Sequence, residues 1–166
     1  EQVAWLRDFL WLAFMPEFLN VAVVDGACNC DCRMCSAGKG KPFQYLTASH
    51  LRKILEYCPT VSRLSFSAGN SEPLLNPEFS GIIDVVSEAD CRMDFYTNGL
   101  ALKPALAKKM VESGAVNMIN FSLDAATEET YRAIRRRNLL RVHEALADLV
   151  AQKKAAFARI SNRIAE

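Results

Sequence analysis

The sequence lacks the features that would point to a membrane protein or a nucleic-acid-binding protein. Its longest early apolar run, residues 9–15, is far too short to span a bilayer. Its charges nearly balance, with 20 Lys and Arg against 19 Asp and Glu, so nothing indicates a nucleic-acid partner or an anionic membrane surface. Histidine is scarce as well. His50 and His143 lie in helical stretches, and we assign them no catalytic role.

The first 17 residues predict a helical extension ahead of the main domain. The segment is apolar, but Arg7 and Asp8 interrupt it and no small-residue cleavage site follows, which argues against a signal peptide. We interpret residues 1–17 as an amphipathic helix that caps one end of the domain, and residues 18–166 as one domain with a real core. A membrane-surface helix is the alternative, although its polar face is not rich in Lys or Arg.

The cysteines are unevenly spread. Four of the six fall within eight residues: Cys28, Cys30, Cys32 and Cys35. A secreted disulfide scaffold spreads its cysteines through a small chain without a core, whereas half of these residues are apolar. We therefore predict metal ligation in a reducing, cytoplasmic compartment. Cys58 and Cys91 are interpreted as inert thiols.

Predicted strands and helices alternate along the chain. Apolar and β-branched runs predict strands over 18–24, 61–67, 93–97 and 117–123, with a fifth around 157–161. Predicted helices begin at Thr47, Asn76-Pro77, Lys103-Pro104 and Thr127, and Gly114 ends the third of these. Repeated βα units imply an α/β fold with a parallel sheet and helices on its outer face. A closed barrel needs about 250 residues, so we predict a partial parallel (β/α) barrel that is incomplete or belongs to a larger protein.

Polar motifs follow the predicted strands at one edge of the sheet. The cysteine loop follows the first strand, SAGNSEP the second, TNG the third, and Ser122 with Asp124 the fourth. In parallel βα folds, functional residues collect at the carboxyl ends of the strands. Four loops that face one crevice indicate an enzyme.

The spacing of the cysteines leaves two kinds of metal site open. Thiolates are soft ligands that suit zinc or iron–sulfur clusters. Cys28, Cys32 and Cys35 have C-x3-C-x2-C spacing, which leaves one iron of a four-iron cluster without a protein ligand. With Cys30 included, the four thiols would instead complete a closed zinc site.

These motifs resemble the radical S-adenosylmethionine (SAM) superfamily, in particular the core of its SPASM and twitch-type members. The likeness runs from about residue 18 to residue 152 and includes the C-x3-C-x2-C loop. SAGNSEPLLNP resembles the family's GGEP segment, with Asn70-Ser71-Glu72 in the GGE positions. The resemblance implies that Glu72 and the nearby backbone hold the methionyl ammonium. Neither paired glycine is kept in register, and Gly69 is expected to supply the flexibility instead.

The later segments carry the resemblance further. DFYTNG resembles the third-strand ending of the family, which implies that Asn98 lies near the cofactor. NFSLDAATEETYRAIRR resembles the fourth-strand segment, which implies that Ser122 and Asp124 contact the ribose or the methionyl carboxylate, with Arg135 as a further candidate for the carboxylate. Met34 replaces a common aromatic residue and is expected to pack on adenine.

Structural roles remain open for several of these residues. Ser122 and Asp124 are also suited to ending a strand and capping a helix, and Met34 to packing within its loop. Charge patterning favours a solvated helix end for the run Arg135–Arg137.

The resemblance implies a [4Fe–4S] cluster on Cys28, Cys32 and Cys35 with SAM as cofactor. In that chemistry one electron cleaves the sulfonium, and a 5′-deoxyadenosyl radical abstracts a hydrogen atom from the substrate in an oxygen-sensitive reaction. The implied partners are a reductant such as flavodoxin or ferredoxin and a peptide or protein substrate. The alternatives are a radical SAM enzyme acting on a small molecule or nucleic acid, and a non-catalytic zinc or iron–sulfur domain.

Overall fold

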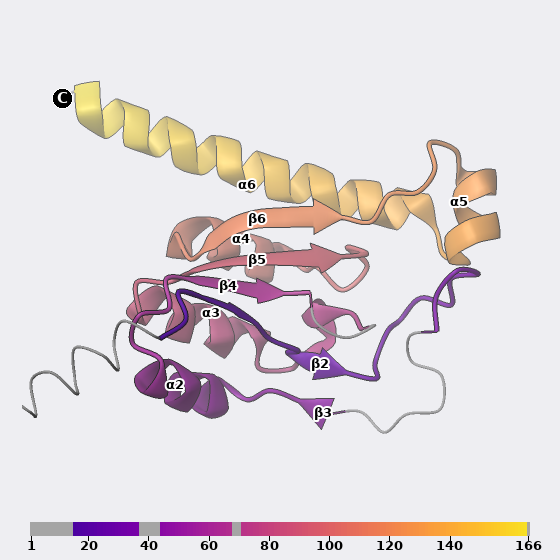
Figure 1. The fold of residues 1–166 in the computed structure, drawn as a ribbon. Coiled ribbons are helices and arrows are strands. Elements are labelled where there is room, and N and C mark those ends of the chain that lie inside the picture. The colour runs from indigo at the N-terminus through magenta and orange to yellow at the C-terminus, as the bar shows by residue number, and fades with distance from the viewer. Residues whose placement is uncertain (1–14, 37–43, 68–70, 166) are drawn as a thin grey trace, which may run out of the picture.

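The computed structural model describes residues 15–36, 44–67 and 71–165 (Figure 1). Most of the predicted helix at 1–17 therefore lies outside the described residues. The strands are β1 (Phe18–Asn20), β2 (Val24–Asp25), β3 (Gln44–Tyr45), β4 (Arg63–Phe66), β5 (Arg92–Thr97) and β6 (Val116–Phe121). The helices are α2 (Ala48–Tyr57), the 3-10 helix η1 (Pro73–Leu75), α3 (Phe79–Glu88), α4 (Pro104–Ser113), α5 (Glu128–Arg135) and α6 (Leu139–Ala165).

Four strands form one parallel sheet in the order β1-β4-β5-β6. The connections between neighbouring strands contain α2, α3 and α4 in turn, and these helices pack side by side on one face of the sheet (Figure 1). This arrangement confirms the predicted α/β fold with a parallel sheet. Within the described ranges the sheet stays open, so the barrel is partial.

The main core lies between the sheet and α3. Leu64 and Phe66 of β4 and Met93 and Phe95 of β5 are buried on the same face, because alternate residues of a strand point the same way. Phe79 of α3 packs edge-to-face against both phenylalanines, with ring centroids 6.2 Å from Phe66 and 5.4 Å from Phe95. This packing fixes where β4 and β5 end, and so where the polar loops begin.

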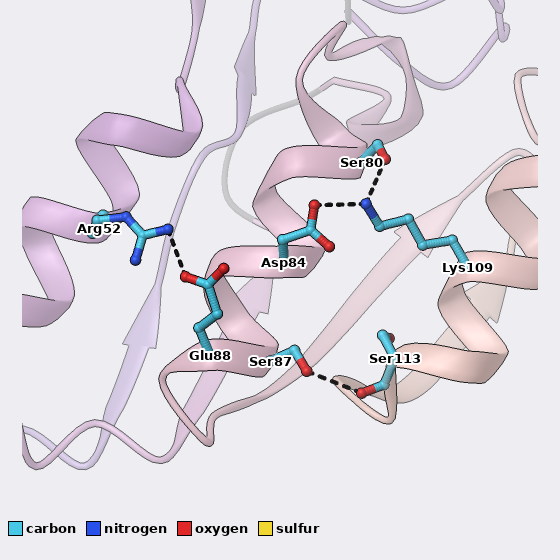
Figure 2. Close-up of polar contacts among 7 residues, drawn as sticks. All are labelled: Arg52, Ser80, Asp84, Ser87, Glu88, Lys109 and Ser113. Atoms are coloured by element: carbon cyan, nitrogen blue, oxygen red, sulfur yellow. Dashed lines mark hydrogen bonds and ion pairs between the residues drawn. The ribbon is translucent and has the colours of Figure 1, made fainter.

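Polar contacts join the helices on their solvent side (Figure 2). Arg52 of α2 pairs with Glu88 of α3 at 2.6 Å. Lys109 of α4 reaches across to α3, where its Nζ lies 2.6 Å from Asp84 Oδ2 and 2.9 Å from Ser80 Oγ. Such half-exposed pairs contribute roughly 0–1 kcal/mol each, so the buried apolar face holds this layer in place.

The prediction of one continuous strand over 18–24 was wrong. The chain leaves the main sheet after Val21, whose N–H still donates to the Ser65 carbonyl at 2.8 Å. Val24 then pairs with β3 in a separate antiparallel ribbon. The apolar run correctly indicated burial, since Val23 and Val24 are buried. Burial, however, does not specify which backbone receives the hydrogen bonds.

The predicted fifth strand around 157–161 was also wrong, because these residues lie inside the 27-residue helix α6. Phe157 and Ile160 are exposed there. A short apolar pattern does not distinguish a strand from a helix, so length has to decide. Of the helices that the structure describes, none is long and apolar enough to cross a membrane.

Asn76 has a different role from the predicted N-cap. Helix α3 begins at Phe79, and Asn76 precedes it as a buried residue. Its Oδ1 accepts from the Glu78 N–H at 2.8 Å, while its Nδ2 donates to the carbonyls of Val23 at 2.7 Å and Leu46 at 2.8 Å. Asn76 therefore ties the start of α3 to the β2–β3 ribbon, from which the cysteine loop leaves.

The other predicted helix ends are confirmed. Thr47 caps α2 by accepting from the His50 N–H at 3.1 Å, and Thr127 caps α5. Helix α4 begins at Pro104 and ends before Gly114, which has the left-handed φ of 67° that favours glycine.

Candidate functional site

The candidate residues lie at the carboxyl end of the sheet, as predicted. The loops after β4, β5 and β6, the loop after β2 and helix α5 all lie at this end (Figure 1). Gly69 and Asn70 lie outside the described residues.

The cysteine loop leaves β2 through Gly26, whose φ is 78°. Cys30 and Cys32 are buried, Cys28 and Cys35 are partly exposed, and all four are free thiols. The Cys35 N–H donates to the Cys32 carbonyl at 3.3 Å, which turns the chain between two of the predicted ligands.

Cys30 differs from the other cysteines in its partner. Its backbone N–H donates to Cys28 Sγ at 3.4 Å. A hydrogen bond from the Cys30 thiol lowers the pKa of Cys28 to about 6 and outweighs the opposing effect of burial. The same hydrogen bond and burial raise the pKa of Cys30 strongly. The contact between these two side chains thus lowers the pKa of Cys28 and raises that of Cys30.

Asn98, at the end of β5, joins three loops. Its Nδ2 donates to Asn29 Oδ1 at 2.7 Å and to Cys28 Sγ at 3.8 Å. Its backbone N–H donates to Glu72 Oε2 at 2.8 Å. The side chain is buried, so these contacts fix the start of the cysteine loop against the loops after β4 and β5.

The Glu72 carboxylate is buried and accepts three hydrogen bonds. The donors are the Leu74 N–H at 3.2 Å, the Thr97 hydroxyl at 2.6 Å and the Asn98 N–H at 2.8 Å. Burial raises the pKa of Glu72, and these donors act in the opposite direction. A carboxylate offers about four acceptor positions, so one remains for a cationic ligand.

The loop after β4 is also bonded to the loop after β2. The Ser71 hydroxyl donates to the Val24 carbonyl at 2.5 Å, and the Glu72 N–H donates to the Ala27 carbonyl at 2.8 Å. The Ser71 side chain is thus engaged within the protein. The backbone of this segment lies beside the start of the cysteine loop.

Helix α5 packs against the far end of the cysteine loop. The Ile134 carbonyl accepts from the Arg33 N–H at 3.0 Å. The Arg135 guanidinium donates to Cys32 Sγ at 3.5 Å and forms an ion pair with Asp124. Asp124 thereby orients the positive charge of Arg135 toward a predicted metal ligand.

The interpretation of Arg135–Arg137 as a solvated helix end is confirmed for Arg136 and Arg137, which are exposed at the end of α5, but was wrong for Arg135. The Arg135 side chain is only 15% exposed. Arg136 Nη1 lies 2.7 Å from Asp31 Oδ2, and Arg137 Nε donates to the Asn29 carbonyl. Charge patterning located the cations but could not show that their partners lie in the cysteine loop.

Two predicted residues, Ser122 and Met34, make fewer contacts with the other site residues. Ser122 is half-buried at the end of β6, where its N–H donates to the Thr97 carbonyl at 2.8 Å. Met34 is 61% exposed on the cysteine loop and is not part of the bonded cluster. Thr97 and Asn29 were not predicted as site residues. The position of Thr97 at the end of β5, directly before Asn98, was the available signal.

The donor set fits an iron–sulfur cluster. Three thiols have the required spacing, and the side chains of Asn98 and Arg135 donate to the sulfurs of Cys28 and Cys32. In the part of the chain that the structure describes, no three His, Cys, Asp or Glu side chains lie close enough to share one metal ion. A four-iron cluster binds each thiolate through a different iron, so its ligands need not lie close enough to share one ion.

Gly99, in the TNG loop, is expected to be the least replaceable glycine here. Its φ is 79°, and a Cβ would lie 2.9 Å from the Phe121 ring and 3.2 Å from Val142 Cγ1. We expect Gly99→Ala to lower the free energy of unfolding by about 2–4 kcal/mol in urea denaturation. Gly114→Ala is the control, because it has similar strain but meets only Arg92 Nη1 at 3.5 Å, and should cost about 1 kcal/mol. Equal losses would show that the Phe121 contact is unimportant.

The chain matches the family model described as Radical SAM superfamily over residues 24–157. It is 30% identical over 111 residues to the mycofactocin maturase MftC of Mycobacterium ulcerans, which covers 66% of this chain and 30% of that protein. It is 26% identical over 106 residues to an AdoMet-dependent heme synthase of Methanosarcina barkeri, covering 63% of this chain and 30% of the synthase. The matched part therefore spans less than a third of each of these two relatives.

Solved structures of similar fold include SuiB of Streptococcus suis bound to S-adenosylmethionine. Its TM-score is 0.71 at 15% identity, with 83% of this chain and 32% of SuiB covered. SuiB has also been solved with its precursor peptide SuiA. Another is anSMEcpe with bound AdoMet and the Kp18Cys peptide, with a TM-score of 0.65 at 17% identity, covering 82% of this chain and 41% of that one. At these identities the likeness concerns the fold.

Proposed function

This chain belongs to the radical SAM superfamily, and from that premise we propose that it is the core of an enzyme that reductively cleaves SAM to a 5′-deoxyadenosyl radical, which abstracts a hydrogen atom from a peptide or protein. The [4Fe–4S] cluster would be held by Cys28, Cys32 and Cys35. One observation supports the proposal most directly: three separate loops are hydrogen-bonded to one another through Glu72 and Asn98, beside Cys28.

When bound, the cluster supplies the electron for SAM cleavage. The residues of this chain donate hydrogen bonds to the cysteine sulfurs and hold the cysteine loop in place. Asn98 donates to Cys28, and Arg135 donates to Cys32. Donors of this kind stabilise anionic sulfur. Arg136 and Arg137 hold the same loop through Asp31 and the Asn29 carbonyl.

Of the residues proposed to bind SAM, Asn98 contacts Cys28 and Arg135 contacts Cys32. The remaining acceptor position of Glu72 suits the methionyl ammonium. The other N–H groups of Arg135 suit the carboxylate, with Asp124 as their orienting partner, and the Ser122 hydroxyl suits the ribose or carboxylate.

Further residues are proposed to contact the two ends of the SAM molecule. The backbone of Gly69, Asn70 and Ser71 is proposed to approach SAM, because the Ser71 hydroxyl is already engaged. Met34 is proposed to pack on adenine from its exposed position, which disturbs no core contact.

The exposed face of the sheet supports a peptide substrate. Tyr96 points away from the helices because its neighbour Phe95 packs against Phe79, and Tyr96 is 56% exposed. Asn120 lies opposite it in register, and its amide nitrogen is buried with no hydrogen-bond partner within the described ranges. Such a donor suits a peptide carbonyl. The maturase name of MftC and the peptides bound by SuiB and anSMEcpe point the same way.

Two alternative functions have to be distinguished from a peptide-modifying enzyme. The heme synthase relative favours a small-molecule substrate. A non-catalytic zinc domain would use all four clustered cysteines, but the raised pKa of Cys30, caused by its hydrogen bond with Cys28 and by burial, supports three ligands instead.

The proposed partners follow from the chemistry. The electron would come from a reductant such as flavodoxin or ferredoxin. A reducing cytoplasmic setting is part of the same proposal, because cysteines bind metal as thiolates and stay reduced in that compartment.

The test is anaerobic reconstitution with iron and sulfide. We expect about four irons per chain and formation of 5′-deoxyadenosine when SAM and dithionite are added. A peptide with deuterated side chains should transfer deuterium into 5′-deoxyadenosine. Stoichiometric zinc without SAM cleavage would support the binding domain, and deuterium transfer from small molecules but not peptides would support the small-molecule enzyme.

A further inference from the structure

Tyr131 carries a buried hydroxyl that has no hydrogen-bond partner in the described part of the chain. The residue is 0% exposed and packs in a small cluster with Leu139 and Val142 of α6. Burying a hydroxyl without a partner destabilises a protein, so such groups are rare in native structures. A phenylalanine would fill the same space without this cost. The hydroxyl therefore indicates a partner outside the described part of the chain.

The surroundings of Tyr131 show on which side of α5 that partner lies. Tyr131 precedes Arg135 by one helical turn, which places both side chains on the same face of α5. Arg135 donates to Cys32 Sγ at 3.5 Å, so this face is the one that meets the cysteine loop. Burial raises the pKa of Tyr131 to about 12. The hydroxyl therefore keeps its proton and stays a hydrogen-bond donor, on the face of α5 that meets Cys32.

We propose that the Tyr131 hydroxyl donates a hydrogen bond to a sulfide of the cluster and thereby makes the cluster easier to reduce. The inference rests on the proposed function, because it requires a cluster on Cys28, Cys32 and Cys35. Reduction adds one electron from an external donor and so one negative charge. A hydrogen-bond donor directed at the sulfurs stabilises that charge and raises the reduction potential.

The test compares Tyr131→Phe with Tyr57→Phe in the reconstituted chain. Tyr57 is 78% exposed on α2, so its variant controls for the loss of a tyrosine hydroxyl away from the site. We expect Tyr131→Phe to keep its full iron content but to show a more negative midpoint potential in a dithionite titration. A tenfold decrease in the equilibrium constant for one-electron reduction would appear as a shift of about 59 mV. Tyr57→Phe should match the wild-type chain.

A second measurement uses the cluster-free chain, in which we expect the substitution to be stabilising. Tyr131→Phe should raise the thermal midpoint because it removes the unpaired hydroxyl. A purely structural role for the hydroxyl would lower that midpoint and overturn the inference.

An unchanged potential in a fully loaded Tyr131→Phe variant would also overturn the inference and leave the proposed function standing. If the wild-type chain takes up no cluster, the proposed function fails and the inference falls with it.

Discussion

Cys32→Ala is expected to abolish cluster assembly, whereas Cys30→Ala retains it. Cys32 holds the middle position of the C-x3-C-x2-C spacing, and its sulfur already accepts a hydrogen bond from Arg135. Cys30 instead has a raised pKa, because it hydrogen-bonds to Cys28 and is buried. Anaerobic reconstitution followed by iron and sulfide analysis and EPR spectroscopy of the reduced sample measures the difference. We expect about four irons per chain for Cys30→Ala and essentially none for Cys32→Ala.

These two substitutions serve as controls for each other. Both side chains are buried in the same loop and both become alanine, so the general loss of packing is similar. Cys58→Ala, in a separate part of the chain, should behave like wild type. Equal loss of iron in Cys30→Ala and Cys32→Ala would mean that four thiolates bind the metal, which contradicts both the chosen ligands and a vacant iron.

Glu72→Gln is expected to weaken SAM binding and to destabilise the chain. A charged hydrogen bond to the ammonium contributes about 2 kcal/mol, or roughly thirtyfold in affinity. The amide also cannot accept from Leu74, Thr97 and Asn98 together, because one of its two heavy atoms is a donor. We therefore expect the free energy of unfolding to fall by about 2 kcal/mol as well. Anaerobic calorimetry with SAM and urea denaturation measure the two effects.

Thr97→Val separates the two effects of Glu72→Gln. It removes the 2.6 Å hydrogen bond to Glu72 Oε1 but leaves the carboxylate charge in place. We expect a loss of about 1 kcal/mol in stability with SAM affinity close to wild type. If Thr97→Val weakens SAM binding as much as Glu72→Gln does, Glu72 acts only by holding the loops together.

The parts of the fold that depend on local chemistry could be predicted from the sequence. Thr47 and Thr127 cap helices through their own hydroxyls, and Gly114 ends α4 through its own backbone, so neighbouring residues decide the outcome. The strand over 18–24 failed for the opposite reason. Its apolar side chains specify burial, but the change of partner after Val21 depends on β3, more than 20 residues away.

In the candidate site, too, some features could be predicted from the sequence and others depended on distant partners. The order of the motifs placed Cys28, Glu72 and Asn98 at one edge of the sheet, and the structure brings them together there. The contacts of α5 with the cysteine loop were missed, because charge patterning carries no information on distant partners. The unpaired Tyr131 hydroxyl was equally invisible, since helical periodicity reports that a side chain is buried and says nothing of what its polar atom meets.

The contact between α5 and the cysteine loop also sets an order of events during synthesis. Cys32 and Arg135 are 103 residues apart in the sequence, so the ribosome releases the thiols well before their cationic partners. Domains are translated from the N-terminus at about 5–20 residues per second, which leaves the nascent thiols without Arg135 for several seconds. The cysteine loop can therefore take the position that the structure shows only after α5 has emerged from the ribosome.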